Sequence, residues 1–144
     1  MATHISPRLA HIAEALPLRG GMRVLEIGCG PGVLARAMVK RLGSGYVLGI
    51  DRSATAIRQA REGSKHELSS GILEFRQAAA EDFTLNANEK PYDMAVAIRV
   101  GALDGRHPEA GKIALHRIKN ALKESGVLYI DGGNPITAVS LDSV

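Results

Sequence analysis

Three glycines and two carboxylates in the first half of the chain have a spacing that could bind a ligand. The glycines stand at positions 28, 30 and 32, with Glu26 before them and Asp51 after them. Glycines in such a run let the backbone turn sharply and approach a ligand with no side chain between. A carboxylate such as Asp51 can accept hydrogen bonds from the hydroxyls of a ribose, whereas Glu26 would attract an ammonium or sulfonium group. These residues predict a site for a nucleoside that carries positive charge.

Cofactors that carry a pyrophosphate fit this pattern less well. A dinucleotide-binding loop has its third glycine where this chain has Val33. The negative charge of Glu26 would also repel the phosphates. S-adenosylmethionine combines a ribose with an ammonium and a sulfonium group, and it is the cofactor that the pattern favours.

The elements that must position these residues alternate between apolar strands and amphipathic helices. Apolar runs predict strands at residues 22–27, 46–50, 72–76, 93–100 and 127–130. Helical spacing predicts helices after Ser6, over 33–42, after Ser53 and from Pro108. Strands that are apolar along their length are typical of a parallel sheet covered on both faces. We therefore expect an α/β fold, a doubly wound three-layer sandwich, with the ligand at the carboxyl ends of the strands.

The composition excludes several other classes of protein. The chain has 144 residues, a formal charge of +3 and 45% hydrophobic residues, which predicts one globular domain over 1–144. Because Cys29 is the one cysteine and the five histidines are scattered, we expect neither a disulfide framework nor a metal site. No apolar run is long enough to cross a membrane, which predicts a cytoplasmic protein. The small charge and the five Phe and Tyr residues disfavour a nucleic-acid binder.

The segment 24–32, Val-Leu-Glu-Ile-Gly-Cys-Gly-Pro-Gly, resembles the first motif of class I S-adenosylmethionine-dependent methyltransferases, which have a Rossmann-like fold. The resemblance extends from about residue 18 to 133, through the segments 51–53, 79–83, 92–93 and 122–126. It implies an enzyme that takes a methyl group from S-adenosyl-L-methionine and leaves S-adenosyl-L-homocysteine. The cofactor-binding residues that it implies, together with those argued above, are Glu26, Gly28, Cys29, Gly30, Gly32, Asp51, Arg52, Ala79, Ala80 and Ile98.

Each of these residues has an expected place around the cofactor. The resemblance implies that the glycine loop backs the methionine part, that Arg52 lies beside the adenine edge, and that Ile98-Arg99 lies near the sulfonium. Two residues also have simpler interpretations. Asp51 could cap the following helix, and Cys29 is expected to serve packing, because no histidine is arranged to activate it.

The chain departs from the family pattern at two places. Ala79 stands where many relatives have an aspartate that meets the adenine amino group, so adenine contacts must rest on the backbone around Ala80 and on Glu81 or Asp82. The sequence also ends 11 residues after Gly133, whereas the family adds a helix and an antiparallel pair of strands. We therefore expect part of the C-terminal strands to be lacking. The edge of the 127–130 strand would then be covered by residues 136–141 or by a homodimer.

Three functions remain open at this point. The first is methyl transfer to a small molecule, and the second is methylation of RNA or protein, which the basic pI of 9.2 favours. The third is a non-catalytic module that binds S-adenosylmethionine, which the short C-terminal end favours. His107 is the best-placed general base, with Asp104 and Arg106 in the same loop, but a histidine next to Pro108 is usually just solvated. No catalytic residue is therefore predicted.

Overall fold

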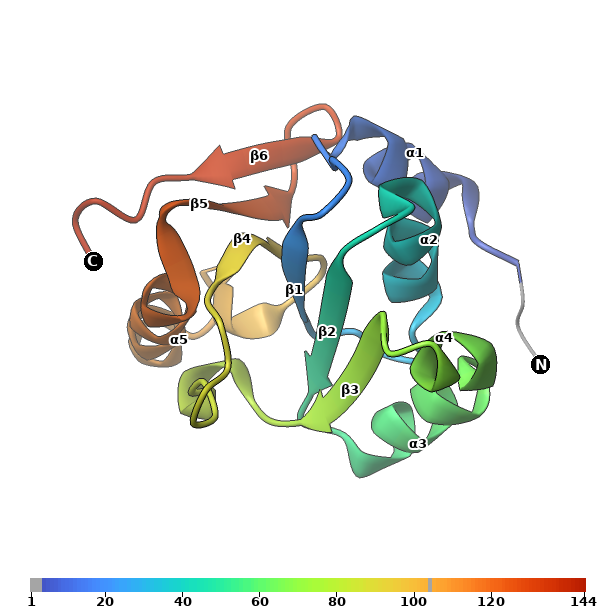
Figure 1. Cartoon of the computed structure of the whole chain (residues 1–144). Helices are drawn as coiled ribbons and strands as arrows, with labels where there is room; N and C mark the ends of the chain where they lie inside the picture. The colour runs from blue at the N-terminus through green and yellow to red at the C-terminus, as the bar shows by residue number, and fades with distance from the viewer. Residues whose placement is uncertain (1–3, 104) are drawn as a thin grey trace.

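The computed structural model describes residues 4–103 and 105–144, so the predictions that concern Met1 to Thr3 and Asp104 lie outside it. Six strands form one sheet in the order β3-β2-β1-β4-β5-β6 (Figure 1). The first five strands run parallel and β6 is antiparallel to β5. The strands are β1 (Arg23–Ile27), β2 (Tyr46–Asp51), β3 (Leu73–Gln77), β4 (Tyr92–Ala97), β5 (Leu122–Asp131) and β6 (Ile136–Val139). The expected α/β fold with a mostly parallel sheet is confirmed.

Helices cover both faces of the sheet because neighbouring residues of each central strand point to opposite sides. On β1, Val24 packs in one apolar cluster with α1, α2 and α3, whereas Leu25 packs in the other with α5. Figure 1 shows α1 to α4 gathered on one side and α5 on the other. The helices are α1 (Pro7–Ala15), α2 (Val33–Leu42), α3 (Ala54–Glu62), α4 (Lys65–Ser69) and α5 (Pro108–Ala121), with 3₁₀ turns η1 (Ala80–Asp82) and η2 (Gly101–Leu103). Across the described residues, no helix is long and apolar enough to cross a membrane.

Two serines begin helices where the sequence predicted them. The Ser6 hydroxyl accepts a hydrogen bond from Leu9 N at 3.2 Å and starts α1. The Ser53 hydroxyl accepts one from Ala56 N at 3.1 Å and starts α3. The suggestion that Asp51 caps α3 is therefore wrong, and Asp51 is free to serve the loop beside it.

The C-terminal part of the sheet begins earlier than expected. The sequence predicts the fifth strand at residues 127–130, but β5 already begins at Leu122, and the residues between Leu122 and Val127 bulge opposite Asp93 of β4. Residues 136–139 form β6, which pairs with residues 128–131 of β5. This part of β5 lies between β4 and β6, so of the two covers expected for its edge, residues 136–141 and a homodimer, the structure has a strand at residues 136–139.

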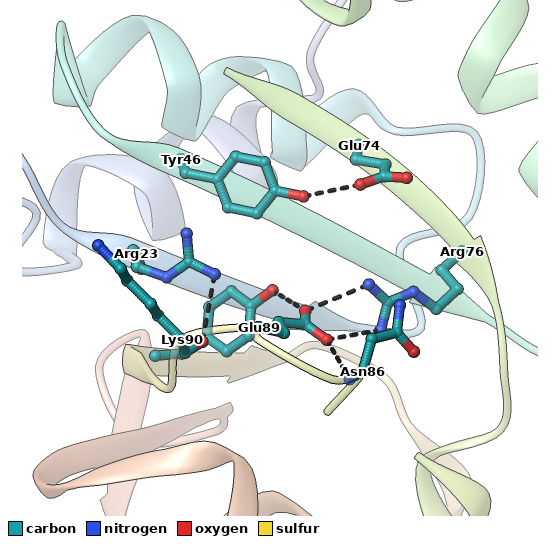
Figure 2. Close-up of polar contacts among 8 residues, drawn as sticks. Arg23, Tyr46, Glu74, Arg76, Asn86, Glu89 and Lys90 are labelled. Carbon is teal, nitrogen blue, oxygen red and sulfur yellow. Dashed lines mark hydrogen bonds and ion pairs between the residues drawn. The ribbon is translucent and has the colours of Figure 1, made fainter. Parts of the chain in front are cut away.

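At the amino ends of the strands, Glu89 fastens the loop between η1 and β4 to the sheet (Figure 2). Arg76 of β3 donates to both oxygens of Glu89 at 3.1 and 3.2 Å, Tyr92 OH donates at 2.6 Å and Asn86 N at 2.7 Å. Burial raises the pKa of Glu89, but these hydrogen bonds outweigh it and hold the pKa below its usual value. We call these four residues the Glu89 cluster. The cluster thus ties the loop that follows η1 to β3 and to the start of β4.

Candidate functional site

The glycine loop follows β1 in a backbone conformation that side chains rarely adopt. Gly28, Gly30 and Gly32 have φ angles of 68°, 53° and 88°, in the left-handed region that only glycine enters freely. A Cβ atom on Gly32 would lie 2.8 Å from Cζ of Phe75, and one on Gly28 would lie 3.0 Å from Cγ2 of Val100. The glycines therefore serve both the turn and close packing.

Asp51 ties this loop to the end of β2. Its Oδ2 accepts a hydrogen bond from Gly30 N at 2.9 Å, and its Oδ1 accepts one from Ser53 N at 2.9 Å. Each carboxylate oxygen has a second lone pair, so Asp51 can still accept hydrogen bonds from two hydroxyl groups. The carboxylate is thus both a support for the loop and a potential ligand contact.

Glu26 is a buried carboxylate with an oxygen that has no partner. Its residue is 3% exposed, and Oε1 makes no hydrogen bond with any residue that the structure describes. Burial, followed by the negative charge of Asp51, raises the pKa of Glu26 to about 8, against an opposing effect of Arg36. An unpartnered buried polar group is costly. A cationic ligand next to Glu26 would supply the missing partner.

Two cavities meet at Gly28 and Arg99, which line both of them. The first, of about 470 Å³, is called the Asp51 cavity and is lined by Ile27, Gly28, Asp51, Arg52, residues 78–81, residues 99–102, His107 and Ala110. The second, of about 630 Å³, is called the Glu26 cavity and is lined by residues 6–9, Glu26, residues 28–31, Val33, Leu34, Ile98 and Arg99. Their sizes suit small organic ligands. Together they form a site at the carboxyl ends of β1, β2 and β4.

The structure brings nearly all of the predicted site residues to these cavities. Gly28, Asp51, Arg52, Ala79 and Ala80 line the Asp51 cavity, and Glu26, Gly28, Cys29, Gly30 and Ile98 line the Glu26 cavity. Gly32, the N-cap of α2, lines neither, and a Cβ atom on it would point toward Phe75 and Arg36.

Three side chains around the cavities have environments that define their roles. Arg52 forms an ion pair with Glu81 at 3.0 Å, so these two residues meet beside the Asp51 cavity. Burial raises the pKa of the Cys29 thiol, and Glu26 and Asp51 add to the effect. Because only a thiolate is a strong nucleophile, Cys29 is not activated for chemistry.

Arg8 lines the Glu26 cavity and was not predicted from the sequence. Arg8 of α1 reaches Asp131 at the end of β5 with a distance of 2.8 Å. Asp131 also accepts a hydrogen bond from the backbone N–H of Arg99 at 3.0 Å, and Arg99 has a φ of 58°. Burial raises the pKa of Asp131, but these two donors outweigh it and the pKa lies below its usual value. A link of this kind between three distant segments has no signature in the sequence.

The first turn of α5 is the other wall that the sequence did not predict. Ala110 lines the Asp51 cavity, and a Cβ atom on Gly111 would overlap the carbonyl oxygen of Ala102. The pair of small residues after Pro108 was a usable signal, because small residues let a helix approach a neighbouring backbone. His107, the candidate base, lies on the Asp51 cavity and does not line the Glu26 cavity.

Comparison with known proteins identifies the family. Residues 18–141 match the sequence model of a family described as a methyltransferase domain. The chain belongs to this methyltransferase family. The resemblance to class I S-adenosylmethionine-dependent methyltransferases and the expected Rossmann-like fold are therefore confirmed.

Individual methyltransferases are also similar to this chain. A ribosomal protein L11 methyltransferase from Dictyoglomus thermophilum is 36% identical over 127 residues, which make up 88% of this chain and 36% of the relative. A ubiquinone biosynthesis O-methyltransferase from Pasteurella multocida is 38% identical over 80 residues, 55% of this chain and 31% of the relative. The chain thus spans about a third of the length of these relatives.

A solved structure shows the same fold. An S-adenosylmethionine-dependent methyltransferase from Thiobacillus denitrificans, in complex with S-adenosyl-L-homocysteine, superimposes with a TM-score of 0.65 and 23% identity. The match covers 88% of this chain and 48% of that one. The methyltransferase fold is therefore shared well beyond the glycine loop.

Proposed function

We propose that this protein binds S-adenosyl-L-methionine across the two cavities and transfers its methyl group to an acceptor. The observation that carries the proposal is Glu26, a buried carboxylate whose Oε1 has no partner, on the wall of the larger cavity. Membership of the methyltransferase family supports the same function. The ammonium of the methionine end would lie beside Glu26, and S-adenosyl-L-homocysteine, the product, retains that ammonium.

The remaining groups of the cofactor have matching partners in this arrangement. The ribose hydroxyls would donate to the free lone pairs of Asp51. The adenine would lie between residues 78–81 on one side and Val100 and Ala102 on the other, in the Asp51 cavity. The methionine carboxylate would face the first turn of α2 at Val33 and Leu34, where helical N–H groups lack partners within the helix. The predicted site residues thus remain our proposal for the cofactor contacts.

Catalysis in this proposal rests mainly on alignment. When bound, S-adenosyl-L-methionine supplies a methyl group whose bond to sulfur breaks, with the electron pair left on sulfur, as a lone pair of the acceptor bonds to the carbon. The walls of the Glu26 cavity hold the acceptor on the far side of that methyl group and exclude water. His107 lies on the adenosine side, so we do not assign it as a general base.

We propose a small molecule as the acceptor. The Glu26 cavity has a volume of about 630 Å³, which leaves room for a small molecule beside the methionine end. The relative from Pasteurella multocida is named for an O-methylation in ubiquinone biosynthesis. Protein methylation is the second candidate, because the relative from Dictyoglomus thermophilum is named for a ribosomal protein.

Calorimetry with S-adenosyl-L-methionine, S-adenosyl-L-homocysteine and NAD tests the cofactor assignment. We expect binding of the first two and much weaker binding of NAD, because NAD has no ammonium group to pair with Glu26, and ionised Glu26 would repel its pyrophosphate. NAD binding as tight as that of S-adenosyl-L-homocysteine would overturn it. Transfer of a labelled methyl group in a cell extract, separated into small molecules, RNA and protein, then identifies the acceptor class. Absence of labelling in every fraction would favour a binding module without catalysis.

A further inference from the structure

Arg99 is an exposed cation in a strained backbone conformation on the wall of the Glu26 cavity. Its φ of 58° places a bulky residue in the left-handed region, which side chains of this kind rarely adopt. The hydrogen bond from its N–H to Asp131 holds the backbone there. Within residues 4–103 and 105–144, the guanidinium itself has no hydrogen bond or ion pair. Backbone strain that presents a free side chain to a cavity is a pattern typical of functional sites.

The other cations around the cavities are already engaged. Arg8 is paired with Asp131 at 2.8 Å, and Arg52 is paired with Glu81 at 3.0 Å. Arg99 is therefore the guanidinium that can meet a new anion without first breaking an ion pair. It also lines both cavities, so it lies where the methionine end and an acceptor would meet.

The charges of the Glu26 cavity favour an anion in the remaining space. Arg8 with Asp131 and Arg99 with Glu26 sum to zero, and the proposed cofactor brings a net charge of +1, from its ammonium, sulfonium and carboxylate. The cofactor ammonium favours the ionised form of Glu26 and pairs with it. The sulfonium and Arg99 then stand against the methionine carboxylate alone, which leaves one net positive charge. A neutral or cationic acceptor would leave this charge unbalanced in a partly enclosed cavity, where charges interact more strongly than in water.

We propose that the methyl acceptor is a small organic acid whose carboxylate is bound by the guanidinium of Arg99. The planar fork of an arginine matches a carboxylate with two parallel hydrogen bonds. This inference rests on the proposed function, since it concerns the acceptor of that methyl transfer. It assigns Arg99 to acceptor recognition, and the cofactor contacts remain with Glu26, Asp51 and the loop.

The test compares carboxylic acids with their amides in the presence of saturating S-adenosyl-L-homocysteine. Benzoate, cinnamate and hexanoate are each paired with the neutral amide of the same shape, and binding is followed by ligand-observed NMR titration. A charge-assisted hydrogen bond is worth about 1.5 to 3 kcal/mol, so we expect at least one acid to bind about tenfold or more tightly than its amide. Arg99→Gln should reduce this preference to about twofold or less, while the affinity for S-adenosyl-L-homocysteine changes by less than about twofold.

A control variant separates the site from net charge. Arg58→Gln removes the same charge from an exposed position on α3 and should leave the preference for acids unchanged. If no acid binds more tightly than its amide, or if Arg58→Gln has the same effect as Arg99→Gln, the inference is wrong. It is also wrong if Arg99→Gln weakens S-adenosyl-L-homocysteine about tenfold, because Arg99 would then hold the methionine carboxylate. Failure of the unaltered protein to bind S-adenosyl-L-homocysteine at all would instead overturn the proposed function, and with it this inference.

Discussion

Replacing Glu26 by glutamine should stabilise the fold at neutral and alkaline pH while it weakens cofactor binding. Glutamine has the shape of a protonated glutamate, so the two proteins should be about equally stable near pH 4.5. Burial and Asp51 raise the pKa of Glu26 from its ordinary value of 4.5 to about 8. A carboxyl group whose pKa is raised by folding contributes stability at low pH and loses it as the pH rises from the unfolded value to the folded one.

The magnitude follows from these two pKa values. Between pH 4.5 and about pH 8 the unaltered protein should lose ~1.4 kcal/mol for each pH unit relative to Glu26→Gln, up to at most about 5 kcal/mol, and nothing more above pH 8. The same substitution removes the partner of the cofactor ammonium. It should therefore weaken S-adenosyl-L-homocysteine by about 1.5 to 3 kcal/mol, the range for a hydrogen bond to a charged group.

Urea unfolding of both proteins across this pH range measures the stability difference, and calorimetry at pH 8 measures the affinity. Glu62→Gln, at an exposed position on α3, is the matched control and should give a difference that does not change with pH. A stability difference for Glu26→Gln that is equally flat would refute the reasoning, because the carboxyl group would then ionise as freely in the folded chain as in the unfolded one. Unchanged affinity would remove Glu26 from the proposed cofactor site.

Three further predictions concern the residues that support the site. Asp51→Ala should weaken the binding of S-adenosyl-L-homocysteine by about 1.5 to 3 kcal/mol in calorimetry. The loss of the hydrogen bonds from Gly30 and Ser53 should also lower the free energy of urea unfolding by about 1 kcal/mol. An unchanged affinity would leave Asp51 with the support of the loop as its one role. Gly32→Ala should lower the free energy of unfolding by more than Gly43→Ala does. Both positions have positive φ, but a Cβ atom on Gly32 would lie 2.8 Å from Phe75, whereas one on Gly43 would have nothing within 4 Å. Equal losses, each about 1 to 2 kcal/mol, would show that Phe75 moves away. Glu89→Gln should destabilise the protein by about 1 to 3 kcal/mol at neutral pH. Since folding lowers the pKa of Glu89, this difference in stability should disappear as the pH falls through that lowered pKa. A difference that persists in acid would argue against an ionic role of the Glu89 cluster.

The sheet could be predicted from the sequence because its central strands β1, β2 and β4 are buried along nearly their whole length. Residues 33–42 were predicted as a helix with its observed bounds, since Leu34, Ala35, Met38 and Leu42 form one buried face. α4 was missed because none of its residues is buried, so it has no apolar face to detect. The early start of β5 at Leu122 depends on pairing with Tyr92, and pairing between distant residues leaves no local pattern.

The site divides in the same way between local and distant information. Glu26, the glycines and Asp51 were predicted because they follow strands whose carboxyl ends meet at one edge of a parallel sheet. Arg8 and Asp131 are separated by 123 positions, and nothing near either residue indicates the ion pair. Among the described residues, the lack of an ion partner for the Arg99 guanidinium likewise follows from the fold, because the fold decides which acidic side chains come near it.

The ion pair between Arg8 and Asp131 also bears on how quickly ligands can leave. The later part of α1 is anchored in the core through Ile12, Ala13 and Leu16, whereas its first turn is held by the partly buried Leu9, by the Ser6 cap and by an ion pair with side chains 41% and 26% exposed. A cap contributes about 1 kcal/mol and an exposed ion pair at most about 1 kcal/mol, so the first turn is held more weakly than the rest of the helix. Release of a bound molecule past it therefore needs no disruption of the core, and its rate should rise with ionic strength as the pair is screened.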